Sequence, residues 1–271
     1  MSIRIVCLSL MLAGLVPSPA YAAQEITVAA AADLQFAFTD VAARFEKSTG
    51  NHVKLTFGSS GNLFVQIQNG APFDLFFSAD TDYAKKLEAA GLIVPGTLYE
   101  YASGKLVIWV PKASPLDLNR GLQVLLDPRV KKIAIANPEH APYGRAAESA
   151  LKHAGVYDRA AAKLVRGENI SQAATFVASG DADVGLLALS LALAPAMKSQ
   201  GRFVEVAADD YQPIRQAAVV LKSSPQTAVA RQFLEYVKSP EMVELLRSYG
   251  FAVPASALAA PLRENKEKTP Q

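Results

Sequence analysis

Residues 26–57 read ITVAAAADLQFAFTDVAARFEKSTGNHVKLTF, and this stretch decides the fold class. Its first five residues form a short apolar run, which is typical of a buried strand. Apolar residues then recur at helical spacing, at Leu34, Phe38, Val41 and Phe45. Gly50 ends that helix, and a second strand over residues 53–57 follows. A strand, a helix and a strand in succession predict an α/β fold with parallel strands.

The same alternation continues along the chain. Further strands are expected at residues 74–78, 106–110, 133–136, 164–167, 182–188, 202–206 and 214–222. Further helices are expected at residues 63–68, 83–90, 145–154, 227–237 and 241–249. The pattern predicts largely parallel sheets.

The chain is expected to form two lobes without a flexible tether. It has no internal repeat and no low-complexity linker, so the division must be made where strands cross, around residues 106–110 and 214–221. The first lobe would comprise residues 23–104 plus 212–257, and the second lobe residues 105–211. Ligands tend to bind in the cleft between such lobes.

The first 22 residues have the features of a secretory signal peptide. Arg4 is the only charge before an apolar run that is shorter than a membrane span, and Ala20-Tyr21-Ala22 offers a cleavage site after Ala22. An uncleaved anchor is the alternative. The only cysteine, Cys7, lies in this leader, so the mature chain would have no disulfide. We expect an exported protein located in the periplasm, with a frayed tail over residues 258–271.

The composition excludes several classes of function. Hydrophobic residues make up 51% and charged residues 19%, as in globular proteins, and the formal net charge is +2. No basic stripe suggests a nucleic-acid partner. No spacing of His, Cys, Asp and Glu resembles a metal-ligand set, and no cofactor motif is present.

Four segments share one local pattern, in which a strand ends, small residues turn and a helix begins. They are 31–33 (Ala-Ala-Asp), 59–62 (Ser-Ser-Gly-Asn), 142–144 (Pro-Tyr-Gly) and 168–171 (Glu-Asn-Ile-Ser). First turns of helices carry free N–H groups and partial positive charge. Several such turns at one cleft would bind an anion without Lys or Arg, although each alone is compatible with an ordinary helix start.

Ser59 and Ser60 are the best side-chain donors, and each is equally compatible with plain N-capping. A serine nucleophile is the enzymatic alternative, with His140 as its base. The segment from residue 58 to 61 lacks the spacing of a nucleophile elbow, and His52 and His153 lie far from the expected cleft. A binding protein that is not an enzyme is therefore favoured.

The chain resembles the periplasmic molybdate-binding proteins of ABC transporters, the ModA-like family, from about residue 25 to 251. The resemblance rests on these segments: 27–34 (TVAAAADL), 57–62 (FGSSGN), 70–80 (GAPFDLFFSAD), 137–145 (NPEHAPYGR), 167–172 (GENISQ), 183–190 (DVGLLALS) and 249–251 (YGF). It implies a bilobal type II periplasmic-binding-protein fold, with two mixed sheets, two hinge crossings and a ligand cleft.

The resemblance also implies a ligand, partners and a set of binding residues. The ligand would be molybdate or tungstate held only by neutral donors, and the partner an inner-membrane ABC permease served by a monomer. Phosphate or sulfate is the alternative ligand. The positions that match the family site are Asp33, Ser60, Tyr143, Ile170 and Ala188.

Two of these positions depart from the family pattern. Ala188 has no hydroxyl where some members have a tyrosine, and Tyr143 could supply one if its ring turned inward. Asp33 replaces a serine, and its carboxylate would repel a dianion. We expect Asp33 to offer its backbone N–H and to cap the helix with its side chain. The alternative is that Asp33 faces the ligand and accepts a proton from it, which would favour hydrogen phosphate.

Overall fold

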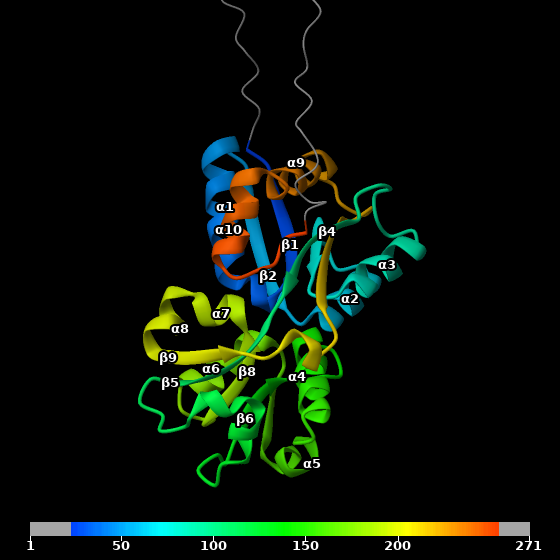
Figure 1. The fold of residues 1–271 in the computed structure, drawn as a ribbon. Coiled ribbons are helices and arrows are strands. Elements are labelled where there is room, and N and C mark those ends of the chain that lie inside the picture. Colours follow the sequence, from blue (N-terminus) through cyan, green and yellow to red (C-terminus); the bar gives the residue numbers. More distant parts are fainter. Residues whose placement is uncertain (1–22, 255–271) are drawn as a thin grey trace, which may run out of the picture.

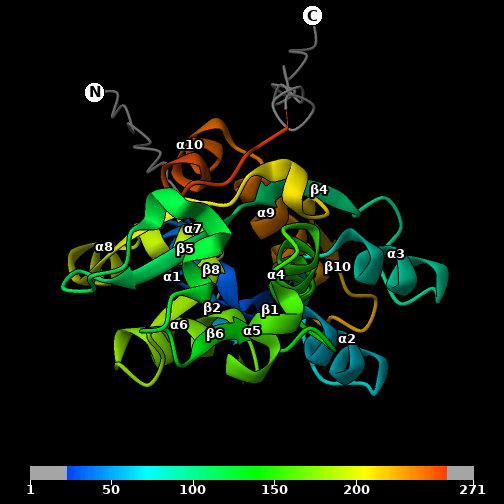
Figure 2. The same cartoon turned by 60° about the horizontal axis from the view of Figure 1, so that its bottom comes forward.

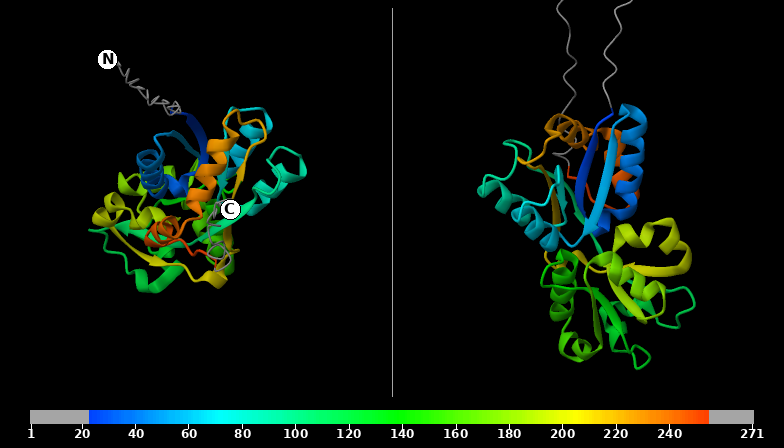
Figure 3. Two further views of the ribbon diagram at one scale, coloured as in Figure 1. Left: turned by 90° about the horizontal axis from the view of Figure 1, so that it is seen from above. Right: turned by 180° about the vertical axis from the view of Figure 1, so that it is seen from behind.

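The computed structural model describes residues 23–254, which form two five-stranded sheets flanked by helices (Figure 1). We call each sheet with its helices a lobe, and the view from behind shows the first lobe above the second (Figure 3). The expected signal peptide and the expected frayed tail lie outside the described residues. None of the helices within 23–254 is long and apolar enough to cross a membrane.

The sheet of the first lobe has the strand order β2-β1-β3-β10-β4. Its strands are β1 (Glu25–Ala31), β2 (His52–Gly58), β3 (Leu75–Ser78), β4 (Tyr99–Gly104) and β10 (Ile214–Val220). β1 pairs in parallel with β2 and β3, whereas β10 is antiparallel to both of its neighbours.

Helices cover both faces of this sheet. They are α1 (Gln35–Thr49), α9 (Thr227–Val237) and α10 (Pro240–Ser248) on one face, and α2 (Ser60–Gln68) and α3 (Thr81–Ala89) on the other. Because side chains alternate along a strand, Val28 of β1 packs with the first group of helices and Ala29 with the second. β1 is therefore buried on both faces, as its apolar sequence predicts.

The sheet of the second lobe has the order β7-β6-β8-β5-β9. Its strands are β5 (Leu106–Pro111), β6 (Ile133–Ala136), β7 (Leu164–Gly167), β8 (Val184–Ala188) and β9 (Gly201–Glu205). Its helices are α4 (Pro142–His153), α5 (Tyr157–Ala160), α6 (Ile170–Ala178), α7 (Leu189–Leu193) and α8 (Pro195–Gln200). Short 3-10 segments complete the chain: η1 (Ala32–Leu34), η2 (Leu118–Leu126), η3 (Ala161–Lys163) and η4 (Ala208–Asp210). α4 and α6 lie on either side of this sheet (Figure 2).

The bilobal α/β fold with two mixed sheets is confirmed, and in each sheet four strands run in one direction while one strand, β10 or β5, runs against them. The chain leaves the first sheet at β4 and enters the second at β5 with only Lys105 between them, and it returns from β9 to β10. These two passages run in opposite directions, so β4 pairs antiparallel with β10 and β5 with β9. The passages between the lobes therefore account for the antiparallel strands.

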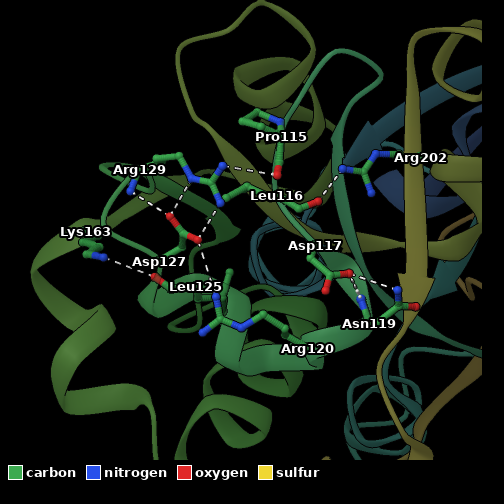
Figure 4. Close-up of polar contacts among 10 residues, drawn as sticks. All are labelled: Pro115, Leu116, Asp117, Asn119, Arg120, Leu125, Asp127, Arg129, Lys163 and Arg202. Atoms are coloured by element: carbon green, nitrogen blue, oxygen red, sulfur yellow. Dashed lines mark hydrogen bonds and ion pairs between the residues drawn. The ribbon is translucent and has the colours of Figure 1, made fainter.

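The link between β5 and β6 is held by polar contacts within the second lobe (Figure 4). Asp127 accepts hydrogen bonds from Arg129 at 2.9 and 2.8 Å, and Arg120 lies 3.5 Å away. The hydrogen bonds from Arg129 lower the pKa of Asp127. Arg202 of β9 donates to the backbone oxygen of Leu116. This link is thereby attached to the edge strand β9 and lies outside the interlobe cavity described next.

Candidate functional site

The four segments singled out in the sequence meet at one cavity between the lobes. It contains about 200 Å³ of space not filled by atoms, part of which is open to solvent. The residues that line it are Ala31, Ala32, Asp33, Gly58, Ser59, Ser60, Ala79, Ala141, Pro142, Tyr143, Asn169 and Ile170. We call this space the interlobe cavity. No Lys or Arg is among these residues, and Asp33 is the only one with an ionisable carboxyl group.

The cavity lies where strands end and helices begin. β1, β2 and β3 of the first lobe end beside it, and the first turns of α2, α4 and α6 start there. The N–H groups of Ser60, Tyr143 and Ile170 donate to no acceptor within residues 23–254. Helix N-termini with free N–H groups favour an anion. The backbone therefore supplies donors from both lobes.

The two serines of the first turn of α2 have different roles. Ser59 is the N-cap, and its Oγ accepts from the N–H of Asn62 at 3.4 Å. Ser60 is fully buried, and its Oγ accepts from the N–H of Ala79 at 2.9 Å. Its hydroxyl hydrogen has no acceptor in the described part of the chain. Ser60 can therefore donate this hydrogen into the cavity.

His140 fixes the loop before α4. The amide nitrogen of Asn137 donates to its Nε2 at 3.2 Å, because the amide oxygen of Asn137 already accepts from the N–H of Glu139. Its Nδ1 lies 2.9 Å from Ser59 Oγ, and the tautomer of the ring decides which of the two donates. His140 therefore contacts the capping serine Ser59 and not Ser60.

The expectation that Asp33 caps a helix is wrong. Neither η1 nor α1 has a side-chain cap, and the N-cap position of η1 is Ala31. Asp33 is 1% exposed, and its Oδ2 accepts from Tyr143 Oη at 3.0 Å and from Gln216 Nε2 at 2.6 Å. Its Oδ1 is buried without a partner in the described chain. Distant side chains, rather than the local helix, orient this carboxyl group.

Burial raises the pKa of Asp33 from 3.8 to about 6, although the hydrogen bonds from Gln216 and Tyr143 oppose the rise. Gln216 is held in place by Tyr101, whose hydroxyl donates to the amide oxygen at 2.7 Å. Burial raises the pKa of Tyr101 and of Tyr143 as well, and the negative charge of Asp33 adds to both. Both phenols therefore stay neutral donors.

The remaining predicted site residues divide into two groups. The hydroxyl of Tyr143 is turned to Asp33 and lies against Gly104, so only its backbone N–H is free. Ile170 offers the free N–H of the first residue of α6. Ala188 is fully buried at the end of β8 and does not line the cavity. The structure thus brings together Asp33, Ser60, Tyr143 and Ile170, but not Ala188.

Direct contacts hold the two lobes together around the cavity. The N–H of Gly61 donates to the backbone oxygen of His140 at 2.9 Å, and Arg145 forms an ion pair with Asp80 at 2.5 Å. Further interlobe hydrogen bonds link Asn62 with Glu168 at 3.0 Å and Ser171 with Gln35 at 2.7 Å. The structure therefore represents a closed arrangement of the lobes.

Three residues that surround Asp33 were not anticipated from the sequence, namely Gln216, Ser190 and Tyr101. Gln216 is fully buried on β10, and Ser190 of α7 donates to the backbone oxygen of Asp33 at 2.7 Å. The signal for Gln216 was available, because it is a neutral polar residue near the start of the apolar run over 214–221. A buried polar residue in a strand requires a partner, and here the partners are Asp33 and Tyr101.

Comparisons with known proteins find relatives among the bacterial solute-binding proteins. The family described as bacterial extracellular solute-binding protein matches residues 26–252. The molybdate-binding protein ModA of Azotobacter vinelandii is 41% identical over 241 residues, which are 89% of this chain and 94% of the relative. The ModA protein of Rhodobacter capsulatus is 40% identical over 85% of this chain and 89% of the relative. The solved structure of the Azotobacter vinelandii periplasmic molybdate-binding protein has a TM-score of 0.80, and the match covers 84% of this chain and 99% of that one.

Proposed function

The chain belongs to the bacterial extracellular solute-binding proteins, and we propose that it captures molybdate or tungstate in the interlobe cavity. The observation that carries this proposal is the set of free donors around the cavity. They are the hydroxyl of Ser60 and the N–H groups of Ser60, Tyr143 and Ile170, and they come from both lobes. Hydrogen bonds to an ionised oxyanion are about twice as strong as neutral ones. Neutral donors can therefore hold a dianion without a cation.

The binding residues in this proposal are Asp33, Ser60, Tyr143 and Ile170, and Ala188 makes no contact of its own. The lobes, residues 23–104 plus 212–257 and residues 105–211, would close about the two passages between the sheets. An inner-membrane ABC permease would recognise the closed form, which the ligand favours only by its differential affinity. The mature protein would act as a periplasmic monomer after cleavage behind Ala22, without catalysing a reaction.

A panel of anions tests the proposed ligand. At a free molybdate concentration about 1,000 times Kd, binding should add about 4 kcal/mol to the free energy of unfolding. For a domain of this size, that should raise Tm by roughly 8–16 °C. Tungstate should act alike, because it is nearly isosteric, whereas sulfate is smaller and should fit the rigid donors poorly.

Differential scanning fluorimetry at constant ionic strength measures these shifts, with sodium chloride as the control. A larger rise with phosphate or sulfate than with molybdate would show that the ligand is another oxyanion. No rise with any anion would refute the binding function.

The hydroxyl of Tyr143 gives a second test, because it joins the lobes without being proposed to touch the ligand. Tyr143→Phe keeps the backbone N–H but removes the interlobe hydrogen bond to Asp33. A neutral hydrogen bond contributes about 0.5–1.5 kcal/mol, so Kd for molybdate should rise about threefold to tenfold. Titration calorimetry measures this, with Tyr157→Phe on α5 as the control. An unchanged Kd would show that this bond does not stabilise closure.

A further inference from the structure

Asp33 poses a problem for a cavity that binds a dianion. Asp33 is 1% exposed and is one of the residues that line the cavity. An ionised carboxylate there would repel a doubly charged oxyanion, and the low local dielectric would strengthen the repulsion. No Lys, Arg or His donates a hydrogen bond to this carboxyl group in the described chain to neutralise it.

The two oxygens of the carboxyl group are not equivalent. Oδ2 accepts two hydrogen bonds, from Tyr143 and Gln216, and thus has the environment of a carbonyl oxygen. Oδ1 is buried and has no donor. An ionised carboxylate would leave this oxygen both charged and unpaired, which is costly. A protonated carboxyl group would instead present Oδ1–H as a donor that needs an acceptor.

We propose that Asp33 takes up one proton from solvent when the oxyanion binds, and donates Oδ1–H to an oxygen of the ligand. This inference rests on the proposed function, in which a tetrahedral dianion occupies the interlobe cavity. Asp33 would then act as a neutral donor. The step converts –COO⁻ and H⁺ into –COOH, and no other bond is made or broken.

The groups that face Asp33 support a single titrating site. α4 contributes Tyr143 and β4 contributes Tyr101, and the pKa of each phenol is raised, so both remain neutral. β10 contributes the amide of Gln216, and α7 contributes the hydroxyl of Ser190. The other helices and strands packed on η1 are α1, α6 and β2, and none of them donates a charged group to this carboxyl. Tyr211 makes the smallest of the contributions that raise the pKa of Tyr143.

The direction of the pH dependence follows from this arrangement. Burial already raises the pKa of Asp33 to about 6, and a bound dianion would raise it further. Below about pH 6 the group is protonated before binding, so affinity should be highest there. Above that pH each binding event must take up a proton, and Kd should rise about tenfold per pH unit until the pKa of the complex is reached.

Asp33→Asn removes the titrating proton but keeps the hydrogen-bonding groups of the side chain. The amide oxygen can still accept from Tyr143 and Gln216, and the amide nitrogen can donate where Oδ1–H would. We expect this variant to bind molybdate with a Kd that is independent of pH, and at pH 8 at least tenfold more tightly than the parent chain. Asp82→Asn, at an exposed position of α3, serves as the matched control and should keep the parent profile.

Titration calorimetry with sodium molybdate from pH 5.5 to 8.5, in two buffers of different ionisation enthalpy, measures both Kd and proton uptake. At pH 7.5 the parent chain should take up about one proton per molybdate, and Asp33→Asn none. The uptake measurement needs only the parent chain, so it tests the inference even if the variant misfolds.

Three results would overturn the inference. Molybdate binding with a flat Kd and no proton uptake would refute it while leaving the proposed function intact. Binding of phosphate in preference to molybdate at pH 8 would mean that the ligand gives its proton to Asp33. No molybdate binding at any pH would instead refute the proposed function itself.

Discussion

Gly61→Ala should weaken molybdate binding about 100-fold without destabilising the ligand-free protein. A Cβ atom at this position would lie 2.6 Å from the backbone oxygen and 2.9 Å from the Cβ of His140, across the gap between the lobes. These atoms belong to the loop before α4 and cannot rotate away as a side-chain tip can. The added Cβ would also lie 2.8 Å from Oη of Tyr83 in the same lobe, but that atom is a side-chain tip and can move. Overpacking of this kind costs about 1–3 kcal/mol, and the hydrogen bond from the Gly61 N–H adds about 1 kcal/mol. Each 1.4 kcal/mol corresponds to a factor of ten in Kd.

The expected stability change has the opposite sign, which separates closure from folding. Gly61 lies in the first turn of α2, where alanine is a better helix former by roughly 0.5–1 kcal/mol. Ligand-free Tm should therefore stay constant or rise, whereas Kd from titration calorimetry should increase. Val65→Ala on the same helix is the control, because Val65 is 51% exposed. A variant with unchanged Kd would show that binding does not require this interlobe contact.

The sequence predicted the local structure well, because local periodicity governs it. The apolar alternation over residues 26–57 predicted β1, α1 and β2 to within about two residues. The four turns were expected to meet because parallel strands end at one edge of a sheet, and all four do line the cavity. What the sequence did not reveal was which of their donors remain free after tertiary contacts form.

Asp33 shows why. Local rules favour an aspartate at a helix start as a cap, and that prediction was wrong. Asp33 lies inside η1 rather than at its N-cap, and η1 has no side-chain cap hydrogen bond. Its partners Tyr143 and Gln216 are 110 and 183 residues away in sequence. No local pattern specifies contacts of that range, and one such pair outweighs the capping preference.

Ser60→Ala should raise Kd for molybdate by roughly two to three orders of magnitude. The hydroxyl hydrogen of Ser60 has no acceptor in the described chain, and a hydrogen bond to an ionised ligand contributes about 1.5–3 kcal/mol. Its removal also leaves the buried N–H of Ala79 without an acceptor, at a further cost of about 1–3 kcal/mol. Titration calorimetry at pH 6 measures this loss of affinity, because at that pH the protonation of Asp33 does not limit binding.

Ser59→Ala is the control that makes this test decisive, because the two serines are neighbours with different partners. Ser59 caps α2 and contacts His140, so its loss should lower the free energy of unfolding by roughly 0.5–2 kcal/mol, the contribution of an N-cap, and should lower Tm accordingly. It should change Kd less, because Ser59 Oγ is already engaged by the N–H of Asn62 and by His140 Nδ1, whereas Ser60 Oγ contacts only the N–H of Ala79. If Ser59→Ala no longer bound molybdate and Ser60→Ala still did, the hydroxyl donor would be Ser59 and not Ser60. The closed cavity as described would then not be the form that binds the anion.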